Sequence, residues 1–468
     1  MTGPDKRSGA PGIFIRPLFA EEAMDLVNGN LKKTFLHYLF ASLGGAVVTS
    51  IYTSVDMICV GHCCGPAGAA AISCVNPLWS IMIGLGLLLG IGGSVWMTAR
   101  RGAGDRAAAD YYFTVALTAG LVLSAVLTLA YLFLREPLLR FFGADDQLIG
   151  YAMEYAQWIA WAVPAFVMEV VLSNFVRNDG APGICAAALL TGGAVNIVGD
   201  IYFVFDFGLG MGMSGAGLAT ALGQVVALGV LCTYFLRKRC GLRLGRGGET
   251  AHVLRKICAS GFAPAIVDLT FGVTVILFNR QIMGYASTTE LAVFGTVANI
   301  AVLFQSLFYG VGQAVQPIVS ASYGAGRRDR VAGMRRIFLV TAGSMGVLFF
   351  AAAALLPQQL LNIYMAVTED ILAIGPAALR IYGISFLFMG INVVSTYYLE
   401  SVLRPRQSLV ISLARGLVFT GLFVLVLPAV FGVQAIWWTM PLSELLTALY
   451  ALASLRGTAD GPALAQRT

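Results

Sequence analysis

The stretch GICAAALLTGGAVNIVGDIYFVF, residues 183–205, decides the fold class of this chain. Asp200 is the one charged residue in it. An α-helix rises about 1.5 Å per residue, so roughly 20 apolar residues cross a hydrocarbon core about 30 Å thick. The stretch therefore predicts a membrane-spanning helix.

The composition of the whole chain agrees with that prediction. Of its 468 residues, 58% are hydrophobic and 12% are charged. Soluble domains average roughly 45–50% apolar and about 25% charged residues, so this chain has too few charges to cover a water-facing surface. The net charge of +6 gives no reason to expect nucleic acid as a partner, because the position of the basic residues matters more than their sum. The eight cysteines show no spacing that predicts a disulfide framework.

Similar apolar runs recur along the chain, without the alternation expected of strands. They predict an all-α integral membrane protein with twelve transmembrane helices. The expected spans are 34–60, 71–98, 111–134, 148–174, 183–205, 214–236, 257–283, 291–323, 337–356, 371–401, 409–430 and 433–452.

The basic residues indicate the orientation in the membrane. Twelve spans put both termini on one side, and 25 of the 30 Lys and Arg residues then fall on that same side. Basic loops stay in the cytoplasm. We therefore expect a multi-pass protein of the cell (inner or plasma) membrane with both termini cytoplasmic.

An internal repeat divides the chain into halves. GIGGSVWMTARRGAG (90–104) resembles GVGQAVQPIVSASYGAG (310–326), with Gly90, Gly92 and Val95 matching Gly310, Gly312 and Val315. Six helices in each half make the two repeats parallel, and such halves can rock to give alternating access. We expect a V-shaped, two-lobed bundle. Its parts are an N-terminal tail (1–30), a first lobe (31–236), a cytoplasmic linker (237–256), a second lobe (257–454) and a C-terminal tail (455–468).

Acidic residues inside the spans need a reason, because a carboxylate at the bilayer centre costs at least about 2.5–3.5 kcal/mol. Asp56, Asp200 and Thr220 lie five or six residues from the outer ends of their expected helices, roughly 8–9 Å below the outer membrane edge. Asn196 precedes Asp200 by one turn on the same face. This set of oxygens predicts a site for a proton or a small cation such as Na⁺.

Spacing alone leaves alternatives open. Asp56 and Asp200 could cap helix ends near water. Asp268, between Pro264 and Gly272, is a candidate for a second-lobe site, with pairing to a neighbouring hydroxyl as its alternative. The role of Glu444 stays open. Glu169 and Glu400 are expected to pair with Arg177 and Arg404.

Other chemistry finds little support. The sequence lacks GxxxxGK[ST], the motif of ATP-binding loops. Its three histidines do not build a catalytic constellation, and His62-Cys63-Cys64 is too contiguous to chelate a metal well. We expect no enzyme, no cofactor beyond the coupling ion, and no metal site.

Several motifs resemble those of the multidrug and toxic compound extrusion (MATE) family, in the same order over nearly all of residues 30–455. They are VDMICVG (55–61), RNDGAP (177–182), NIVGDIYFVF (196–205), GMSGAGLATALGQ (212–224) and QPIVSASYGAG (316–326). The resemblance implies a carrier that exports organic cations and drugs in exchange for inward Na⁺ or H⁺. It implies cation-coupling roles for Asp56, Asn196, Asp200 and Thr220.

The family's second-lobe pattern is only partly present. Some members carry an acid in the seventh helix, for which Asp268 is the candidate, and an aspartate in the tenth. Here the tenth helix offers Asn392 and Glu400 instead, so we expect coupling through the first lobe. The expected partners are small organic cations and the lipid bilayer, with the protein acting as a monomer. The alternatives are a lipid-linked oligosaccharide flippase of related fold and a membrane-embedded transferase.

Overall fold

The computed structural model describes residues 26–142, 144, 146–237, 240–285, 288–364 and 369–456. Within these ranges the chain is helical and contains no strand. The first half comprises α1 (Leu31–Gly102), α2 (Arg106–Phe141), α3 (Ile149–Asn178), α4 (Pro182–Val204), α5 (Met213–Cys232) and η1 (Thr233–Leu236). The second half comprises α6 (Thr250–Tyr285), α7 (Thr288–Gly324), α8 (Arg328–Leu355), α9 (Pro357–Tyr364), α10 (Glu369–Gly383), α11 (Phe386–Ser401), α12 (Pro405–Leu413), η2 (Ala414–Val418), α13 (Phe419–Phe431), η3 (Val433–Trp438) and α14 (Thr439–Leu455).

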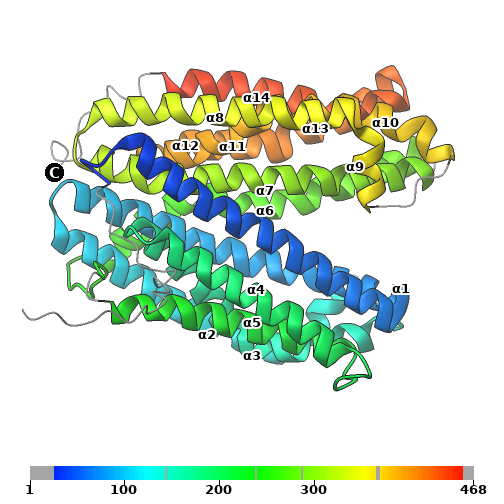
Figure 1. Ribbon diagram of the computed structural model, residues 1–468, viewed down its shortest axis with the longest axis horizontal. Helices are drawn as coiled ribbons and strands as arrows, with labels where there is room; N and C mark the ends of the chain where they lie inside the picture. The colour runs from blue at the N-terminus through cyan, green and yellow to red at the C-terminus, as the bar shows by residue number, and fades with distance from the viewer. Residues whose placement is uncertain are drawn as a thin grey trace, which may run out of the picture.

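Helix α1 contains two of the expected spans. At about 1.5 Å per residue, its 72 residues would extend over three times the thickness of a hydrocarbon core. Figure 1 shows that α1 instead folds back on itself at the end where its label stands. The returning part, Cys74–Gly102, is by itself long and apolar enough to cross a membrane.

Helices of the second half are more broken than the sequence predicts. The span expected over 371–401 consists of α10 and α11, which meet at a bend of 44°. The span expected over 409–430 consists of α12, α13 and the π-helical turn η2 between them. Among the described residues, 8 helices qualify as spans by length and composition, or 9 with the bent pair. The first part of α1, α6, and α14 with η3 complete the twelve expected crossings.

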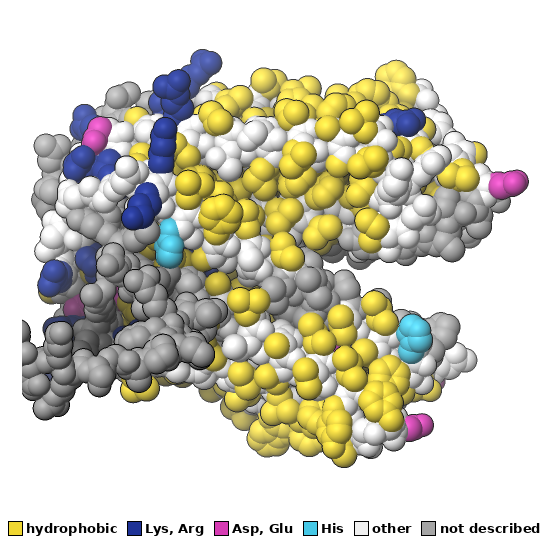
Figure 2. Space-filling model, viewed as in Figure 1, with side chains coloured by type: hydrophobic (Ala, Val, Ile, Leu, Met, Phe, Trp, Pro, Cys, Tyr) yellow, Lys and Arg dark blue, Asp and Glu magenta, His cyan; other side chains and the backbone are white. Residues whose placement is uncertain are grey.

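The helices form two lobes that diverge like a V, with α1–α5 below and α6–α14 above in Figure 1, except that the start of α1 crosses to the upper lobe. Figure 2 shows the space between the lobes open at one end, while Lys and Arg gather mainly at the other end, here called the basic end. On the face shown in Figure 2, apolar side chains are spread over both lobes. The fold class predicted from the sequence is therefore confirmed.

Glycines of the internal repeat join the lobes at the basic end. A Cβ on Gly102 of α1 would lie 2.2 Å from the carbonyl oxygen of Ala321 in α7. Reciprocally, a Cβ on Gly324 of α7 would lie 1.8 Å from the carbonyl oxygen of Ala99 in α1. Only glycine permits such close backbone contact. The ends of α1 and α7 therefore cross as a pseudo-symmetric pair.

The turn after α3 anchors the chain that connects the lobes. Asp179 forms an ion pair with Arg101 of α1 and accepts hydrogen bonds from the backbone N–H of Gly241 (2.8 Å) and the hydroxyl of Tyr234 (2.5 Å). Arg101 also donates to the carbonyl oxygen of Gly241 at 3.0 Å. Since α6 begins at Thr250, the last residues of the segment expected as a linker are helical.

Candidate functional site

Polar side chains from four helices meet inside the first lobe. Tyr155 of α3 donates a hydrogen bond from its hydroxyl to Oδ2 of Asp56 in α1 at 3.0 Å. The same hydroxyl lies 3.4 Å from Oγ1 of Thr220 in α5. Asn196 of α4 donates to that Oγ1 at 3.2 Å. The structure thus links three of the residues selected from the sequence through Tyr155, which the sequence analysis did not select.

Asp200 completes this group of acceptor oxygens. Its side chain is 0% exposed, one helical turn after Asn196, and within electrostatic reach of Asp56. Neither carboxylate oxygen of Asp200 has a hydrogen-bond partner among the described residues. The same holds for Oδ1 of Asp56 and Oδ1 of Asn196. Buried acceptors without donors are costly, and a proton or a bound cation would satisfy them.

Close helix packing explains why these side chains meet. A Cβ on Gly217 of α5 would lie 2.1 Å from the carbonyl oxygen of Tyr155, and one on Gly192 of α4 would lie 2.7 Å from that of Gly223 in α5. Glycines at these crossings let α5 approach both α3 and α4. That approach brings Thr220, three residues after Gly217, within hydrogen-bond distance of Asn196. We call Asp56, Tyr155, Asn196, Asp200 and Thr220 the first-lobe cluster.

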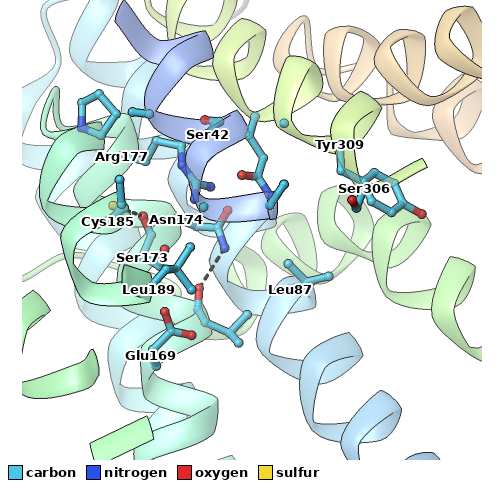
Figure 3. A pocket seen from close by; sticks show the side chains of 18 of the residues that line it. Ser42, Leu87, Glu169, Ser173, Asn174, Arg177, Cys185, Leu189, Ser306 and Tyr309 are labelled. Atoms are coloured by element: carbon cyan, nitrogen blue, oxygen red, sulfur yellow. Dashed lines mark hydrogen bonds between the residues drawn. The ribbon is translucent and has the colours of Figure 1, made fainter. Parts of the chain in front are cut away.

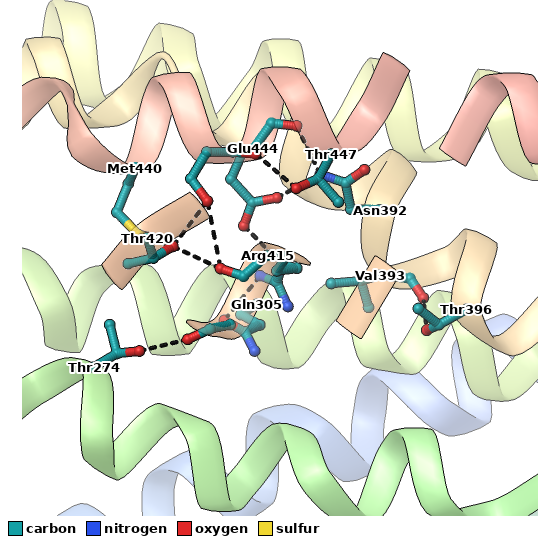
Figure 4. Close-up of polar contacts among 12 residues, drawn as sticks. Thr274, Gln305, Asn392, Val393, Thr396, Arg415, Thr420, Met440, Glu444 and Thr447 are labelled. Atoms are coloured by element: carbon teal, nitrogen blue, oxygen red, sulfur yellow. Dashed lines mark hydrogen bonds and ion pairs between the residues drawn. The ribbon is translucent and has the colours of Figure 1, made fainter. Parts of the chain in front are cut away.

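The second-lobe candidate, Asp268, belongs to helix α6. Its side chain is outside the described part of the structure. The described second lobe instead holds a buried ion pair that the sequence analysis did not foresee (Figure 4). Nε of Arg415 donates to Oε1 of Glu444 at 2.7 Å. Nδ2 of Asn392 donates to Oε2 of Glu444 at 2.6 Å. Glu444 is 0% exposed, so Arg415 neutralises a carboxylate that has no access to water.

The turn η2 places Arg415 in this position. The hydroxyl of Thr420 donates to the carbonyl oxygen of Arg415 at 2.6 Å and lies 2.8 Å from the hydroxyl of Ser443. Nη2 of Arg415 reaches Gln305 of α7 at 3.3 Å. No sequence motif marks this π-helical turn, although an arginine and a glutamate within adjacent expected spans are a signal for pairing.

Two salt bridges expected from the sequence are wrong. Among the described residues, no ion pair within 4 Å joins Glu169 to Arg177 or Glu400 to Arg404. Glu400 instead accepts a hydrogen bond from the hydroxyl of Ser408 at 2.8 Å. Arg177 follows Glu169 by eight residues, about 12 Å along a helix, which is why sequence proximity did not produce a contact.

Glu169 and Arg177 line a cavity of about 380 Å³ between the lobes (Figure 3). Its walls come from α1, α3, α4 and α5 on one side and from α6, α7 and α11 on the other. The lining includes Asn174, Gln313 and Tyr309 as well as apolar side chains. A cavity of mostly apolar surface with a few polar groups is typical of sites for small molecules.

The fold and these sites define a two-lobed membrane transporter, and comparisons with known proteins specify its family. The MatE family model matches residues 42–202 and 264–426, one match in each lobe. The chain belongs to the MATE family. Membership in this transporter family removes the membrane-embedded transferase considered from the sequence.

Known relatives and solved structures agree with this assignment. The chain is 25% identical over 427 residues to the multidrug export protein MepA of Staphylococcus saprophyticus, covering 90% of this chain and 92% of that protein. A MATE multidrug resistance transporter in the outward-facing conformation superimposes with a TM-score of 0.87 at 22% identity, covering 96% of this chain and 99% of the other. A crystal structure of MATE in complex with MaL6 gives a TM-score of 0.88 at 21% identity, covering 96% and 100%.

Proposed function

We propose that this protein is an antiporter that exports organic cations and drugs in exchange for inward Na⁺ or H⁺. The observation that carries the proposal is the first-lobe cluster, in which four buried oxygens have no hydrogen-bond donor among the described residues: Oδ1 of Asp56, Oδ1 of Asn196 and both carboxylate oxygens of Asp200. The named relative that exports drugs supports the substrate class. The basic end faces the cytoplasm in this proposal, following the positive-inside rule.

Coupling follows from differential binding to two states of the carrier. With the basic end inside, the lobes of this structure open outward, and a coupling ion enters the first-lobe cluster from that side. Its positive charge satisfies Asp56 and Asp200 and changes the hydrogen bond from Tyr155, which favours repacking of α1 against α3 and release of the drug. An ion shifts the equilibrium only as far as its affinities for the two states differ.

The buried ion pair of the second lobe makes one of its acids unavailable for coupling. Glu444 is already neutralised by Arg415 at 2.7 Å, so this carboxylate offers no vacant charge to a coupling ion. A lipid-linked oligosaccharide flippase, the alternative function, would need a basic cavity for its phosphates, whereas the cavity between the lobes carries Glu169 as well as Arg177.

The test is ion-driven efflux of ethidium from proteoliposomes, with the Na⁺ and H⁺ gradients collapsed separately. Asp56→Asn, which keeps the side-chain shape but removes the charge, is expected to abolish efflux while insertion into the membrane stays intact. Glu154→Gln is the matched control, because Glu154 is exposed near the start of α3. Full efflux by Asp56→Asn would contradict the coupling assignment.

A further inference from the structure

Two basic side chains from different lobes meet where the returning part of α1 crosses α6. In α1, Arg100 follows Trp96 by four residues, and in α6, Ser260 follows Lys256 by four. Residues four apart share one face of a helix. Nε1 of Trp96 donates a hydrogen bond to Oγ of Ser260 at 3.0 Å. This contact brings the same faces of α1 and α6 together.

Glycines fix the register of the two helices. A Cβ on Gly92 of α1 would lie 2.1 Å from the carbonyl oxygen of Ile257 in α6, and one on Gly261 of α6 would lie 1.9 Å from that of Leu88 in α1. Only glycine permits such close backbone contact. Rising residue numbers in α6 thus meet falling numbers in α1, so the helices run antiparallel. The two basic residues therefore lie beside each other, one turn nearer the basic end than the hydrogen bond between the helices.

The charges of the two basic residues are not balanced by nearby acids. Nζ of Lys256 lies 5.2 Å from the centre of the Trp96 ring and within electrostatic reach of Arg100. Among the described residues, Lys256 forms no ion pair within 4 Å. Arg100 has one such pair, with Asp105 at 3.6 Å, but its buried Nε has no hydrogen-bond partner. Because like charges repel, this pair of cations calls for a bound anion.

The pair lies where the headgroups of phospholipids are expected. Arg100 stands two residues after one of the spans expected from the sequence, and Lys256 stands one residue before another. Both side chains are partly exposed. Trp96, within its span, stacks on Tyr112 of α2 with ring centroids 5.5 Å apart. Aromatic rings at this depth are typical of the membrane interface, with Lys and Arg on its water side.

We propose that Arg100 and Lys256 bind the phosphate of an anionic phospholipid in the leaflet at the basic end, so that one headgroup joins α1 of the first lobe to α6 of the second. Guanidinium and ammonium groups both form charge-assisted hydrogen bonds with phosphate oxygens. Basic sites between helices on the cytoplasmic side are typical for such headgroups. The inference goes beyond the proposed function and does not depend on it, because lipid binding is measured without transport.

The test compares two lipids that differ at one group. Native mass spectrometry of the purified full-length protein resolves each bound lipid during titration with dioctanoyl phosphatidylglycerol or dioctanoyl phosphatidylcholine. The second lipid has the same chains and phosphate but adds a cation, which the two basic side chains repel. We expect the first phosphatidylglycerol to bind about tenfold tighter or more, the gain typical of one charge-assisted hydrogen bond. Equal affinities would overturn the proposal, and this comparison needs no variant.

Neighbouring residues supply matched controls for variants of the site. Lys256→Gln and Arg100→Gln are each expected to weaken phosphatidylglycerol about tenfold and to leave phosphatidylcholine within about twofold. Arg255→Gln and Arg106→Gln remove the same charge from exposed neighbours and should change both affinities by less than about twofold. A preference for phosphatidylglycerol that survives both site variants, or an equal loss in the controls, contradicts the proposal.

A soluble phosphate compound is the alternative ligand. Glycerol 3-phosphate carries the anionic group without acyl chains, so we expect it to bind at least about tenfold more weakly than phosphatidylglycerol, because buried methylene groups add to membrane-lipid affinity. Equally tight binding of glycerol 3-phosphate would overturn the lipid assignment.

A purely structural role of Lys256 predicts a different result. If Lys256 serves only to pack on Trp96, Lys256→Gln lowers the melting temperature in lipid-free detergent and leaves the lipid preference unchanged. This outcome also overturns the proposal. With a bound lipid, phosphatidylglycerol raises the melting temperature of the wild type, since a ligand of the folded state stabilises it, and raises that of Lys256→Gln less.

Discussion

At the scale of single residues, Tyr155 is the side chain that connects the first-lobe cluster. Its hydroxyl touches both Asp56 and Thr220, and its ring is buried at 2% exposure. The sequence offers only the weak signal of a tyrosine in an apolar helix. Its role follows from the packing of α3 against α1 and α5, which no local pattern specifies.

Tyr155→Phe should therefore impair coupling without unfolding the lobe. It removes the hydroxyl that donates to the carboxylate of Asp56, and a hydrogen bond to a charged group contributes about 1.5–3 kcal/mol. We expect the ion concentration that gives half-maximal efflux to change by about tenfold or more. Tyr202→Phe is the control, because Tyr202 is exposed on α4 at 52%. An unchanged ion dependence in Tyr155→Phe would show that this hydroxyl is not part of the ion site.

At the scale of helices, two glycines of α5 offer a matched comparison. A Cβ on Gly217 would lie 2.1 Å from a backbone carbonyl oxygen of α3, whereas one on Gly229 would have no neighbour within 4 Å. Gly217→Ala should lower the free energy of unfolding by about 1–3 kcal/mol through overpacking and reduce efflux. Gly229→Ala should be neutral or stabilising by up to about 1 kcal/mol, since alanine favours helices. Thermal unfolding of both variants in one detergent checks this, and equal melting temperatures would contradict it.

The buried ion pair between η2 and α14 gives a second prediction at this scale. Arg415→Met leaves Glu444 buried without its cation, which costs about 3–5 kcal/mol, so we expect a marked fall in melting temperature. The double change Arg415→Met with Glu444→Gln removes both charges and should recover much of the loss. Arg336→Met on the exposed face of α8 serves as the control. A double variant no more stable than Arg415→Met alone would mean that the unpaired charge of Glu444 is not the cause of the lost stability.

At the scale of the whole molecule, the lobes diverge from the basic end, where the Gly102 and Gly324 crossings hold α1 and α7 together. This geometry and the charge distribution predict which end faces the outside of the cell. The fold-back of α1 lies at the open end (Figure 1). Cys63 is exposed and belongs to the middle part of α1 (Leu31–Gly102), so it should react with a membrane-impermeant maleimide added to intact cells. Replacing Cys63 and Cys64 by serine should remove that labelling.

Adding Arg336→Cys to the serine background tests the basic end. The new thiol should react only after the membrane is opened, because the positive-inside rule places this surface in the cytoplasm. Labelling of Arg336→Cys in intact cells, together with protection of Cys63, would reverse the assigned orientation and with it the direction of ion entry.

The sequence by itself determined the membrane class, the approximate spans, the duplicated halves and four of the five residues in the first-lobe cluster. These features depend on the hydropathy of each segment, on short motifs and on an internal sequence repeat. All of them can be read from the chain without knowing which distant segments pack together. Only the tertiary structure decided that Tyr155 joins Asp56 to Thr220, that Arg415 pairs with Glu444 across a π-helical turn, and that Glu169 and Arg177 remain unpaired in a shared cavity. The physical reason is that such contacts depend on how closely helices approach and how they are rotated, which side-chain packing between distant segments sets.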